Sequence, residues 1–238
     1  MKRALAPAIY FLIFCVFTIL FVFPAALRGN MESALKKTFP HEKVSVGRCR
    51  WHWPPALSIE SLQAGKLHVE GLRAGVRLSG RTLSLQPLFF RFLGQPVTGR
   101  ATVLLQTPLR TDIHLSLATL PVSALLETMD WDKKLSVKSL LTGDVFLAFE
   151  GDRLADLRGN LASLSPGGDI VILDQEFLRQ IAERAKQPLE IVKASFENYH
   201  YNTGIVSLSL ADEKVRLGLH LDGEQGKRDL EVTLHDFI

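Results

Sequence analysis

The chain has 238 residues, of which 47% are hydrophobic and 22% charged, with a formal net charge of +3. This balance excludes a largely disordered protein, because disordered chains lack the apolar residues that bury a core. The basic residues are scattered along the sequence, so the charge pattern excludes a nucleic-acid footprint and we expect no nucleic acid among the partners.

The first predicted element is an apolar segment, Ala8–Leu27, that contains no charged residue. As a helix, its roughly 20 residues span about 30 Å, which matches the hydrocarbon core of a bilayer. Cleaved signal peptides usually have a shorter apolar core followed by small residues. The exit Phe23–Leu27 lacks that pattern, so we predict an uncleaved single-pass anchor, with a cleaved signal peptide as the alternative.

The orientation of this anchor is weakly indicated by the flanking charges. Lys2 and Arg3 precede the segment, and Arg28, Lys36 and Lys37 follow it. Because the leading segment is very short, we expect the anchor to lie in the inner membrane of a Gram-negative bacterium, with the C-terminal part in the periplasm. The predicted divisions are a cytoplasmic stub and anchor (1–29), a membrane-proximal neck (30–43) and a periplasmic β-rich domain (44–238).

The neck contains a short amphipathic segment, Asn30–Phe39, that we predict to be helical and to stop at Pro40. Strand patterns follow it, separated by turns at Gly65, Gly71 and Gly80. The first expected strands are Val44–Arg50, Leu57–Leu62, Lys66–Glu70, Gly75–Ser79 and Thr82–Gln86. Longer strands are expected at Thr98–Gln106, Leu109–Leu117, Leu140–Glu150 and Leu154–Leu164.

Three helices are predicted between the later strands, at Pro121–Met129, Leu173–Lys186 and Leu189–Ala194. The second of them has an apolar stripe at helical spacing, which should pack on the sheet and includes Phe177, Leu178 and Ile181. Its polar side, with Arg179, Glu183 and Lys186, should face water.

The last three expected strands, Ile205–Leu210, Lys214–Leu221 and Asp229–Leu234, alternate cleanly between apolar and polar residues. Such alternation is typical of strands with one buried face. The few predicted helices cannot cover so many strands, so the sheet must either bend upon itself or pack against a second sheet. An incomplete bend leaves a groove, whereas a closed sandwich has nearly the same sequence pattern.

We therefore predict a mainly β fold: an N-terminal transmembrane helix, then a curved, mostly antiparallel sheet that forms a groove or incomplete barrel, with two or three short helices. Burial of acyl chains in such a groove is worth about 0.8 kcal/mol per CH₂ group, so membrane phospholipid is a sufficient ligand. The candidate lipid-groove residues are Leu208, Val215, Leu217, Leu219, Leu221, Leu230 and Val232.

Motifs that indicate an enzyme or a cofactor site are missing from the sequence. It contains no Gly-x-Ser-x-Gly, Gly-x-x-x-x-Gly-Lys, His-Glu-x-x-His or Cys-x-x-Cys pattern, and its seven histidines are spread along the chain. We interpret the Gly-rich stretch Ser163–Gly168 as a turn rather than a phosphate-binding loop. The prediction is a protein that is not an enzyme and has no catalytic residues, cofactor or metal site.

Three stretches carry a resemblance to a known group of envelope proteins. Arg50–Leu62, RWHWPPALSIESL, resembles the entry to a strand in type II secretion protein N. Leu117–Gly143 resembles the recurring AsmA-like unit in which Leu-Pro-Val opens a helix and a later Gly begins a strand. Phe196–Leu234 is similar to the C-terminal end of YdbH-type proteins. Together these stretches resemble the AsmA-like superfamily of envelope proteins.

The resemblance implies a protein of the inner membrane and periplasm that shields or transfers lipid along an apolar β-groove during cell-envelope biogenesis. The alternative is an accessory subunit of the type II secretion system, similar to protein N, whose sheet acts as a docking scaffold. The partners expected from these two readings are the inner membrane, its phospholipid and other envelope or secretion proteins.

Overall fold

The computed structural model describes residues 23–38, 41–151, 153–196 and 199–234. Most of the predicted anchor, Ala8–Leu27, lies outside these residues. Within the described ranges, no helix combines the length and the apolar character needed to span a bilayer.

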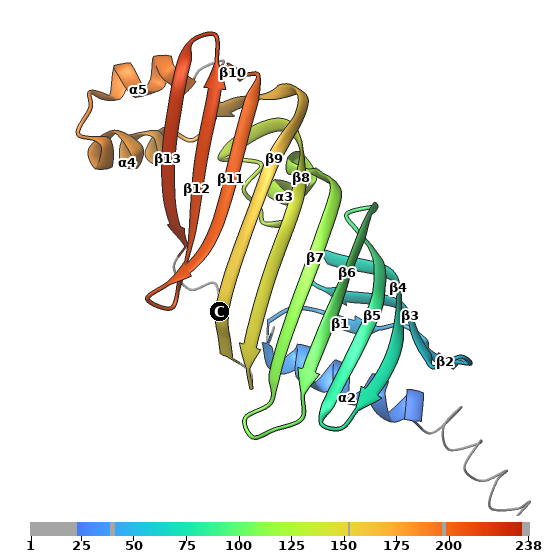
Figure 1. The fold of residues 1–238 in the computed structure, drawn as a ribbon. Helices are drawn as coiled ribbons and strands as arrows, with labels where there is room; N and C mark the ends of the chain where they lie inside the picture. Colours follow the sequence, from blue (N-terminus) through green and yellow to red (C-terminus); the bar gives the residue numbers. More distant parts are fainter. Residues whose placement is uncertain (1–22, 39–40, 152, 197–198, 235–238) are drawn as a thin grey trace, which may run out of the picture.

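One large, open antiparallel sheet dominates the described part of the chain (Figure 1). Its 13 strands are β1 (Val44–Val46), β2 (Cys49–His52), β3 (Ala56–Ala64), β4 (Leu67–Ser79), β5 (Thr82–Phe92), β6 (Gln95–Leu104), β7 (Arg110–Pro121), β8 (Leu135–Glu150), β9 (Arg153–Ile172), β10 (Tyr199–Tyr201), β11 (Thr203–Ala211), β12 (Lys214–Gly223) and β13 (Gly226–Leu234). The spatial order is β1-β3-β4-β5-β6-β7-β8-β9-β11-β12-β13, with β2 paired to β3 and β10 paired to β9. The described chain is thus a meander in a single sheet, not two packed sheets.

Few and short helices accompany the sheet in the described residues: α2 (Phe23–Thr38), α3 (Val122–Thr128), α4 (Gln175–Ala185) and α5 (Leu189–Phe196). The three helices predicted after the neck are confirmed, with slightly different ends. The neck helix is also present, but it begins at Phe23 and ends before the predicted stop. Figure 1 shows α4 and α5 together beside the last strands, β12 and β13, and α2 beside the first strands on the opposite side of the sheet.

Two predicted turns are wrong, because the sheet absorbs them as bulges. Gly71 lies inside β4, where it has a φ of +59° and the pairing with β5 shifts between Glu70 and Arg73. The stretch Ser163–Gly168 lies inside β9. Ser163 pairs with Leu141 of β8 and Gly168 pairs with Ser139, so the residues between Ser163 and Gly168 bulge out of the pairing. A bulge adds unpaired residues to one strand without ending it.

The hairpin between β5 and β6 was missed in the sequence, where the expected strands ended at Gln86 and resumed at Thr98. Its turn is Leu93-Gly94, and both residues have positive φ, 50° and 75°. Two successive positive φ values are the geometry of a type I′ turn, which matches the twist of the flanking strands. Pro87 and Pro96 hid these strands, since proline is unusual inside a sheet.

Cross-strand pairing places apolar residues on one face of the sheet and polar residues on the other. One apolar row of consecutive partners runs through Leu85, Ala101, Ile113, Leu147 and Leu157. The adjacent row on the opposite face runs through Arg100, His114, Phe146, Arg158 and Ser209. We refer to the first as the apolar face and the second as the polar face.

Glycines on the apolar face allow neighbouring strands to come unusually close. A Cβ atom on Gly99 would lie 2.2 Å from the carbonyl oxygen of His114, and one on Gly143 would lie 2.1 Å from that of Asn160. Both obstacles are backbone atoms, which cannot move aside as a side-chain tip can. Glycine is therefore required at these positions for the neighbouring strands to approach as closely as they do.

Helix α2 packs on the first strands through Met31 and Leu35, which contact the cluster of Val46, Cys49 and Ile59. The Glu32 carboxylate accepts a hydrogen bond from the Val46 amide at 3.3 Å and pairs with Arg28 Nε at 3.3 Å. The hydrogen bond from Val46, and then Arg28, lowers the pKa of Glu32.

Acid is expected to weaken this attachment of α2. Because the pKa of Glu32 is lower in the folded state, its stabilising effect is present above the unfolded pKa and is lost as the pH falls through the folded pKa. Glu32→Ala should therefore lower the melting temperature at neutral pH but not in acid. The control is Glu60→Ala, at an exposed position of β3. A difference between wild type and Glu32→Ala that persists in acid would contradict this assignment.

Candidate functional site

An apolar cavity of about 640 Å³ lies on the apolar face of the sheet, beneath α3 and α4. Its lining from the strands is Phe90, Phe92, Val97, Leu115, Leu117, Leu120, Leu135, Val137, Leu141, Val145, Leu161, Ile170, Ile172, Tyr201, Gly204, Val206, Leu208, Leu217, Leu219, Leu221, Asp229, Leu230 and Glu231. Its lining from the helices and the loop after α3 is Val122, Leu125, Leu126, Met129, Trp131, Phe177 and Gln180. Only a few polar groups reach this surface, so the cavity suits an apolar occupant.

The end of the cavity near α4 and α5 is closed by a packed cluster. Leu126 of α3, Leu178 of α4 and Phe196 of α5 are buried there against Tyr199 and Tyr201. Burial raises the pKa of the Tyr201 hydroxyl, whose surroundings are mostly apolar. These helices therefore cap one end of the cavity instead of covering the whole apolar face.

Five of the seven candidate residues predicted on the C-terminal strands line the cavity. They are Leu208, Leu217, Leu219, Leu221 and Leu230. They come together because β11, β12 and β13 pair in a register that aligns their apolar positions.

Two other candidates are not among the lining residues. Val215 is buried beside Leu154 and Leu157, because it lies at the start of β12, where the apolar side chains of β8, β9 and β11 pack against one another. Val232 pairs with Leu217 in β13, but its side chain is outside the described part of the structure.

Most of the lining was not named from the sequence. It comes from β5 to β9 and from α3, which lie up to about half the chain away from β12. A signal was present, since Leu115 and Leu117 alternate with polar residues in the expected strand Leu109–Leu117. What the sequence did not reveal is that α3 folds over β7 and β8, so that Leu125 and Val122 pack above Leu120 and Leu141.

An ion pair joins two distant parts of the fold beside the cavity. Lys66, in the turn between β3 and β4, donates to Asp130 Oδ1 at 2.5 Å and to the Glu127 carbonyl oxygen at 3.4 Å. The pair raises the pKa of Lys66 and lowers that of Asp130. Asp130 lies between Met129 and Trp131, both of which line the cavity. The ion pair therefore ties the β3–β4 turn to the loop that borders the cavity after α3.

Helix α4 begins after Asp174, whose side chain accepts hydrogen bonds from the amides of Glu176 and Phe177. Leu178 is buried and Phe177 lines the cavity, while the side chain of Ile181 is outside the described part. The polar side of the helix, with Arg179, Glu183 and Lys186, is exposed.

Leu178→Ala is expected to lower the free energy of unfolding by about 2–5 kcal/mol, the usual cost of removing a buried leucine side chain. Leu178 is only 5% exposed and contacts the cluster that closes the cavity. Chemical denaturation would measure the loss. The control is Leu173→Ala, because Leu173 precedes the same helix but is 53% exposed. A loss for Leu178→Ala as small as that of the exposed control would show that α4 is loosely attached.

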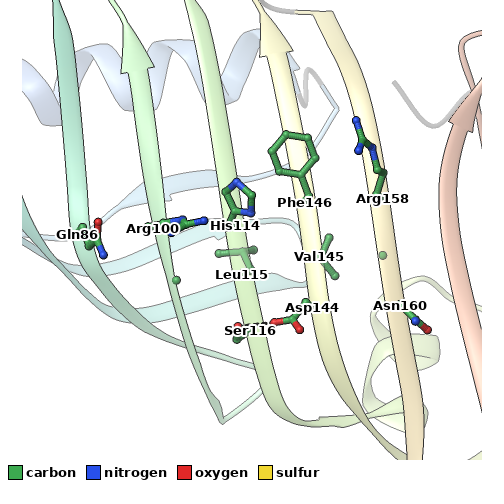
Figure 2. Close-up of a pocket in the computed structure, with 12 residues that line it drawn as sticks. Gln86, Arg100, His114, Leu115, Ser116, Asp144, Val145, Phe146, Arg158 and Asn160 are labelled. Carbon is green, nitrogen blue, oxygen red and sulfur yellow. Dashed lines mark hydrogen bonds between the residues drawn. The ribbon is translucent and has the colours of Figure 1, made fainter.

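The polar face carries a shallow depression lined by residues of β5 to β9 (Figure 2). Its His114 ring lies 4.6 Å from the Phe146 ring, and the Arg158 guanidinium lies 5.5 Å from the same ring. Ser116 donates to Asp144 at 2.5 Å. His114 is thus engaged with an aromatic ring, and no hydrogen bond between His114 and Ser116 is present in the described structure, so the arrangement is not that of a nucleophile and its base.

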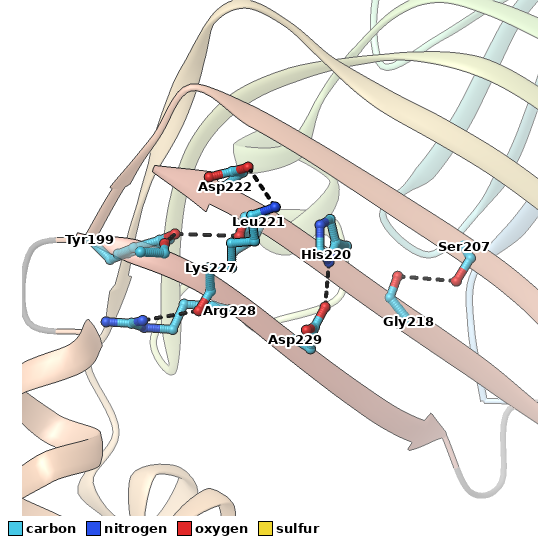
Figure 3. Close-up of polar contacts among 10 residues, drawn as sticks. Tyr199, Ser207, Gly218, His220, Leu221, Asp222, Lys227, Arg228 and Asp229 are labelled. Carbon is cyan, nitrogen blue, oxygen red and sulfur yellow. Dashed lines mark hydrogen bonds and ion pairs between the residues drawn. The ribbon is translucent and has the colours of Figure 1, made fainter. Parts of the chain in front are cut away.

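Three other histidines each pair with one carboxylate, two of them across neighbouring strands and one within a strand. His220 contacts Asp229 between β12 and β13 (Figure 3), and His200 contacts Asp169 at 2.8 Å. His68 contacts Glu70 at 2.9 Å within β4. Among the described residues, no three His, Cys, Asp or Glu side chains gather in a group that could hold a metal ion.

The chain matches no protein-family model, curated protein or solved structure with which it was compared. The resemblance to AsmA-like proteins therefore stays a prediction from sequence patterns. The features that bear on function are those of the molecule itself, above all the apolar cavity and the way in which the helices cap it.

Proposed function

We propose that this protein is an envelope protein, anchored by its N-terminal segment, that shields or transfers lipid along the apolar face of its sheet. The observation that carries the proposal is the apolar cavity, which is bounded by strands from both halves of the sheet and by α3 and α4. Its volume of about 640 Å³ lies within the range of small-molecule sites, which is about 300–1,000 Å³.

The chemistry of the lining favours an acyl chain over water or a polar ligand. Water in a cavity needs two to four polar partners, and the only lining residues with polar side-chain groups are Trp131, Gln180, Tyr201, Asp229 and Glu231, out of thirty. Each CH₂ group that leaves water contributes about 0.8 kcal/mol, so about ten buried groups contribute roughly 8 kcal/mol. A lipid tail therefore gains enough from burial to stay bound without a charged partner.

The location is part of the proposal and rests on the sequence. An uncharged segment at Ala8–Leu27 would place the domain beside an inner membrane that supplies phospholipid. The alternative, a docking scaffold of a secretion apparatus, requires only the surface of the sheet and leaves the cavity without lipid.

Native mass spectrometry of the full chain, extracted from membranes in mild detergent, tests the proposal. We expect a population that carries one phospholipid and keeps it at an activation energy that removes loosely bound lipid. The expected intact mass includes the N-terminal segment. A protein that never carries lipid under these conditions would contradict the lipid function and favour the scaffold, whereas a mature chain that begins near Arg28 would contradict the anchor.

A further inference from the structure

Two neighbouring hairpins end in exposed leucines. Leu78, near the tip of the β4–β5 hairpin, is 65% exposed. Leu105 and Leu109, in the loop between β6 and β7, are 43% and 45% exposed. We call these three residues the leucine tips. Exposed leucines at the ends of narrow hairpins have no partner within the described structure that would shield them from water.

The β4–β5 and β6–β7 turns, which carry the leucine tips, lie side by side at the end of the sheet opposite α4 and α5 (Figure 1). The Leu105 amide donates to the Arg81 carbonyl oxygen at 2.8 Å, and the Gly151 amide donates to the Leu109 carbonyl oxygen at 2.7 Å. The β4–β5, β6–β7 and β8–β9 turns are therefore held together by backbone hydrogen bonds. This makes the leucine tips one composite surface and not two independent hairpin ends.

Positive charge surrounds the leucine tips. Arg77 in β4 and Arg81 in the β4–β5 turn are exposed, and neither forms an ion pair with another residue that the structure describes. Arg110 follows Leu109 and pairs with Asp112 at 3.3 Å. Leucines at the tips with arginines just behind them are the arrangement that places apolar groups below the headgroups of a bilayer and cations at their phosphates.

The β11–β12 turn at the same end of the sheet carries paired charges instead. Its carboxylates are offset by arginines, since Glu213 pairs with Arg153 of β9 at 2.6 Å and Asp212 pairs with Arg216 at 3.2 Å. An anionic surface would attract Arg77 and Arg81, beside the leucine tips, more than this paired region. The charge pattern therefore gives the sheet a preferred orientation on a negatively charged bilayer.

The apolar face continues from the cavity towards the leucine tips. Beyond the row that contains Leu85, the next row of cross-strand partners begins at Leu78 and passes through Leu83 and Val103. It crosses β7 at Thr111 and continues on β8 and β9 with Phe149 and Leu154. A surface that is apolar apart from Thr111 thus connects the cavity with the exposed end of the hairpins.

We propose that the leucine tips and their arginines form a membrane-contact surface that binds an anionic phospholipid bilayer. The leucines insert into the interface, and Arg77 and Arg81 bind lipid phosphates. This surface contains no residue of the N-terminal segment, and its contact would bring the hairpin end of the sheet onto a bilayer. The inference does not depend on whether lipid occupies the cavity.

Vesicle flotation tests this inference with the full chain held in phosphatidylcholine nanodiscs. The added vesicles contain phosphatidylcholine alone or phosphatidylcholine mixed with phosphatidylglycerol. We expect binding to the mixed vesicles that weakens with salt, because the arginine contacts are screened. Leu105→Ser combined with Leu109→Ser should reduce it at least about tenfold, since insertion of the leucines supplies much of the affinity.

The matched control is Leu140→Ser combined with Ile205→Ser, because these residues are 45% and 46% exposed but lie away from the leucine tips. All variants should keep the wild-type melting temperature, which shows that folding is unchanged.

A second variant, Arg77→Glu with Arg81→Glu, should abolish the preference for phosphatidylglycerol. The inference is overturned if wild-type protein does not bind the mixed vesicles, or if the control pair loses as much binding as the leucine pair. Cavity lipid is measured separately by mass spectrometry, so the two proposals can fail independently.

Discussion

Leu219→Asp is expected to remove lipid from the cavity while the protein stays folded. Leu219 lines the cavity and pairs with Val206 and Leu230 on the neighbouring strands. The new carboxylate would face a bound acyl chain, and burying an unpaired charge against apolar surface costs about 3 kcal/mol or more. That cost corresponds to about a hundredfold loss of lipid affinity. Without lipid, water can reach the charge from the open side, so the fold should tolerate it.

Lipid retention and thermal melting are measured on the same preparation. The control is Ser209→Asp, which places the same charge on the exposed, polar face of β11. Retention of lipid by Leu219→Asp, at a wild-type melting temperature, would show that lipid does not occupy the cavity. If Leu219→Asp greatly lowers the melting temperature and the wild-type protein never binds lipid, Leu219 is instead a purely structural core residue.

Tyr199→Ala is expected to be the most destabilising of these substitutions, with a loss of about 3–5 kcal/mol in the free energy of unfolding. The Tyr199 side chain is fully buried in the cluster that closes the cavity. Its ring lies 6.3 Å from that of Phe196, and the Arg228 guanidinium lies 5.1 Å from it. Its hydroxyl donates to the Gly226 carbonyl oxygen at 2.6 Å and lies close to Leu221 (Figure 3).

Tyr199→Phe separates the packing from the hydrogen bond. It keeps the ring and should cost only about 1 kcal/mol, the usual net value of one hydrogen bond. Urea denaturation of both variants gives the two values. Equal losses would mean that the hydroxyl, and not the packing of the ring against Phe196, holds α5 and β10 on the sheet.

Much of the local structure follows from alternation along the chain. Val215, Leu217, Leu219 and Leu221 alternate with polar residues, and this pattern alone predicts a strand with one apolar face. The same reasoning identified α4 from the spacing of its apolar residues. Both conclusions depend only on the period of the side chains, which is a property of the strand or the helix itself.

Irregular positions were harder to predict, because they depend on the neighbouring strand. Gly71 has the residue type of a turn, yet pairing on both sides carries β4 through it as a bulge. Pro87 and Pro96 argue against strands when each is considered alone. The ladder that surrounds them makes β5 and β6 continuous to the turn at Leu93.

The sequence by itself determined that this is a mainly β protein with one apolar face, few helices and an uncharged segment near its beginning. Only the tertiary structure decided what that face encloses. Leu115, Leu161 and Leu219 meet around one cavity because a single sheet presents β7, β9 and β12 on a common side, and α3 closes over them. Side-chain period sets which residues share a face. The order of the strands, with the close backbone approach at Gly99 and Gly143 and the packing of α3, sets which of those residues meet.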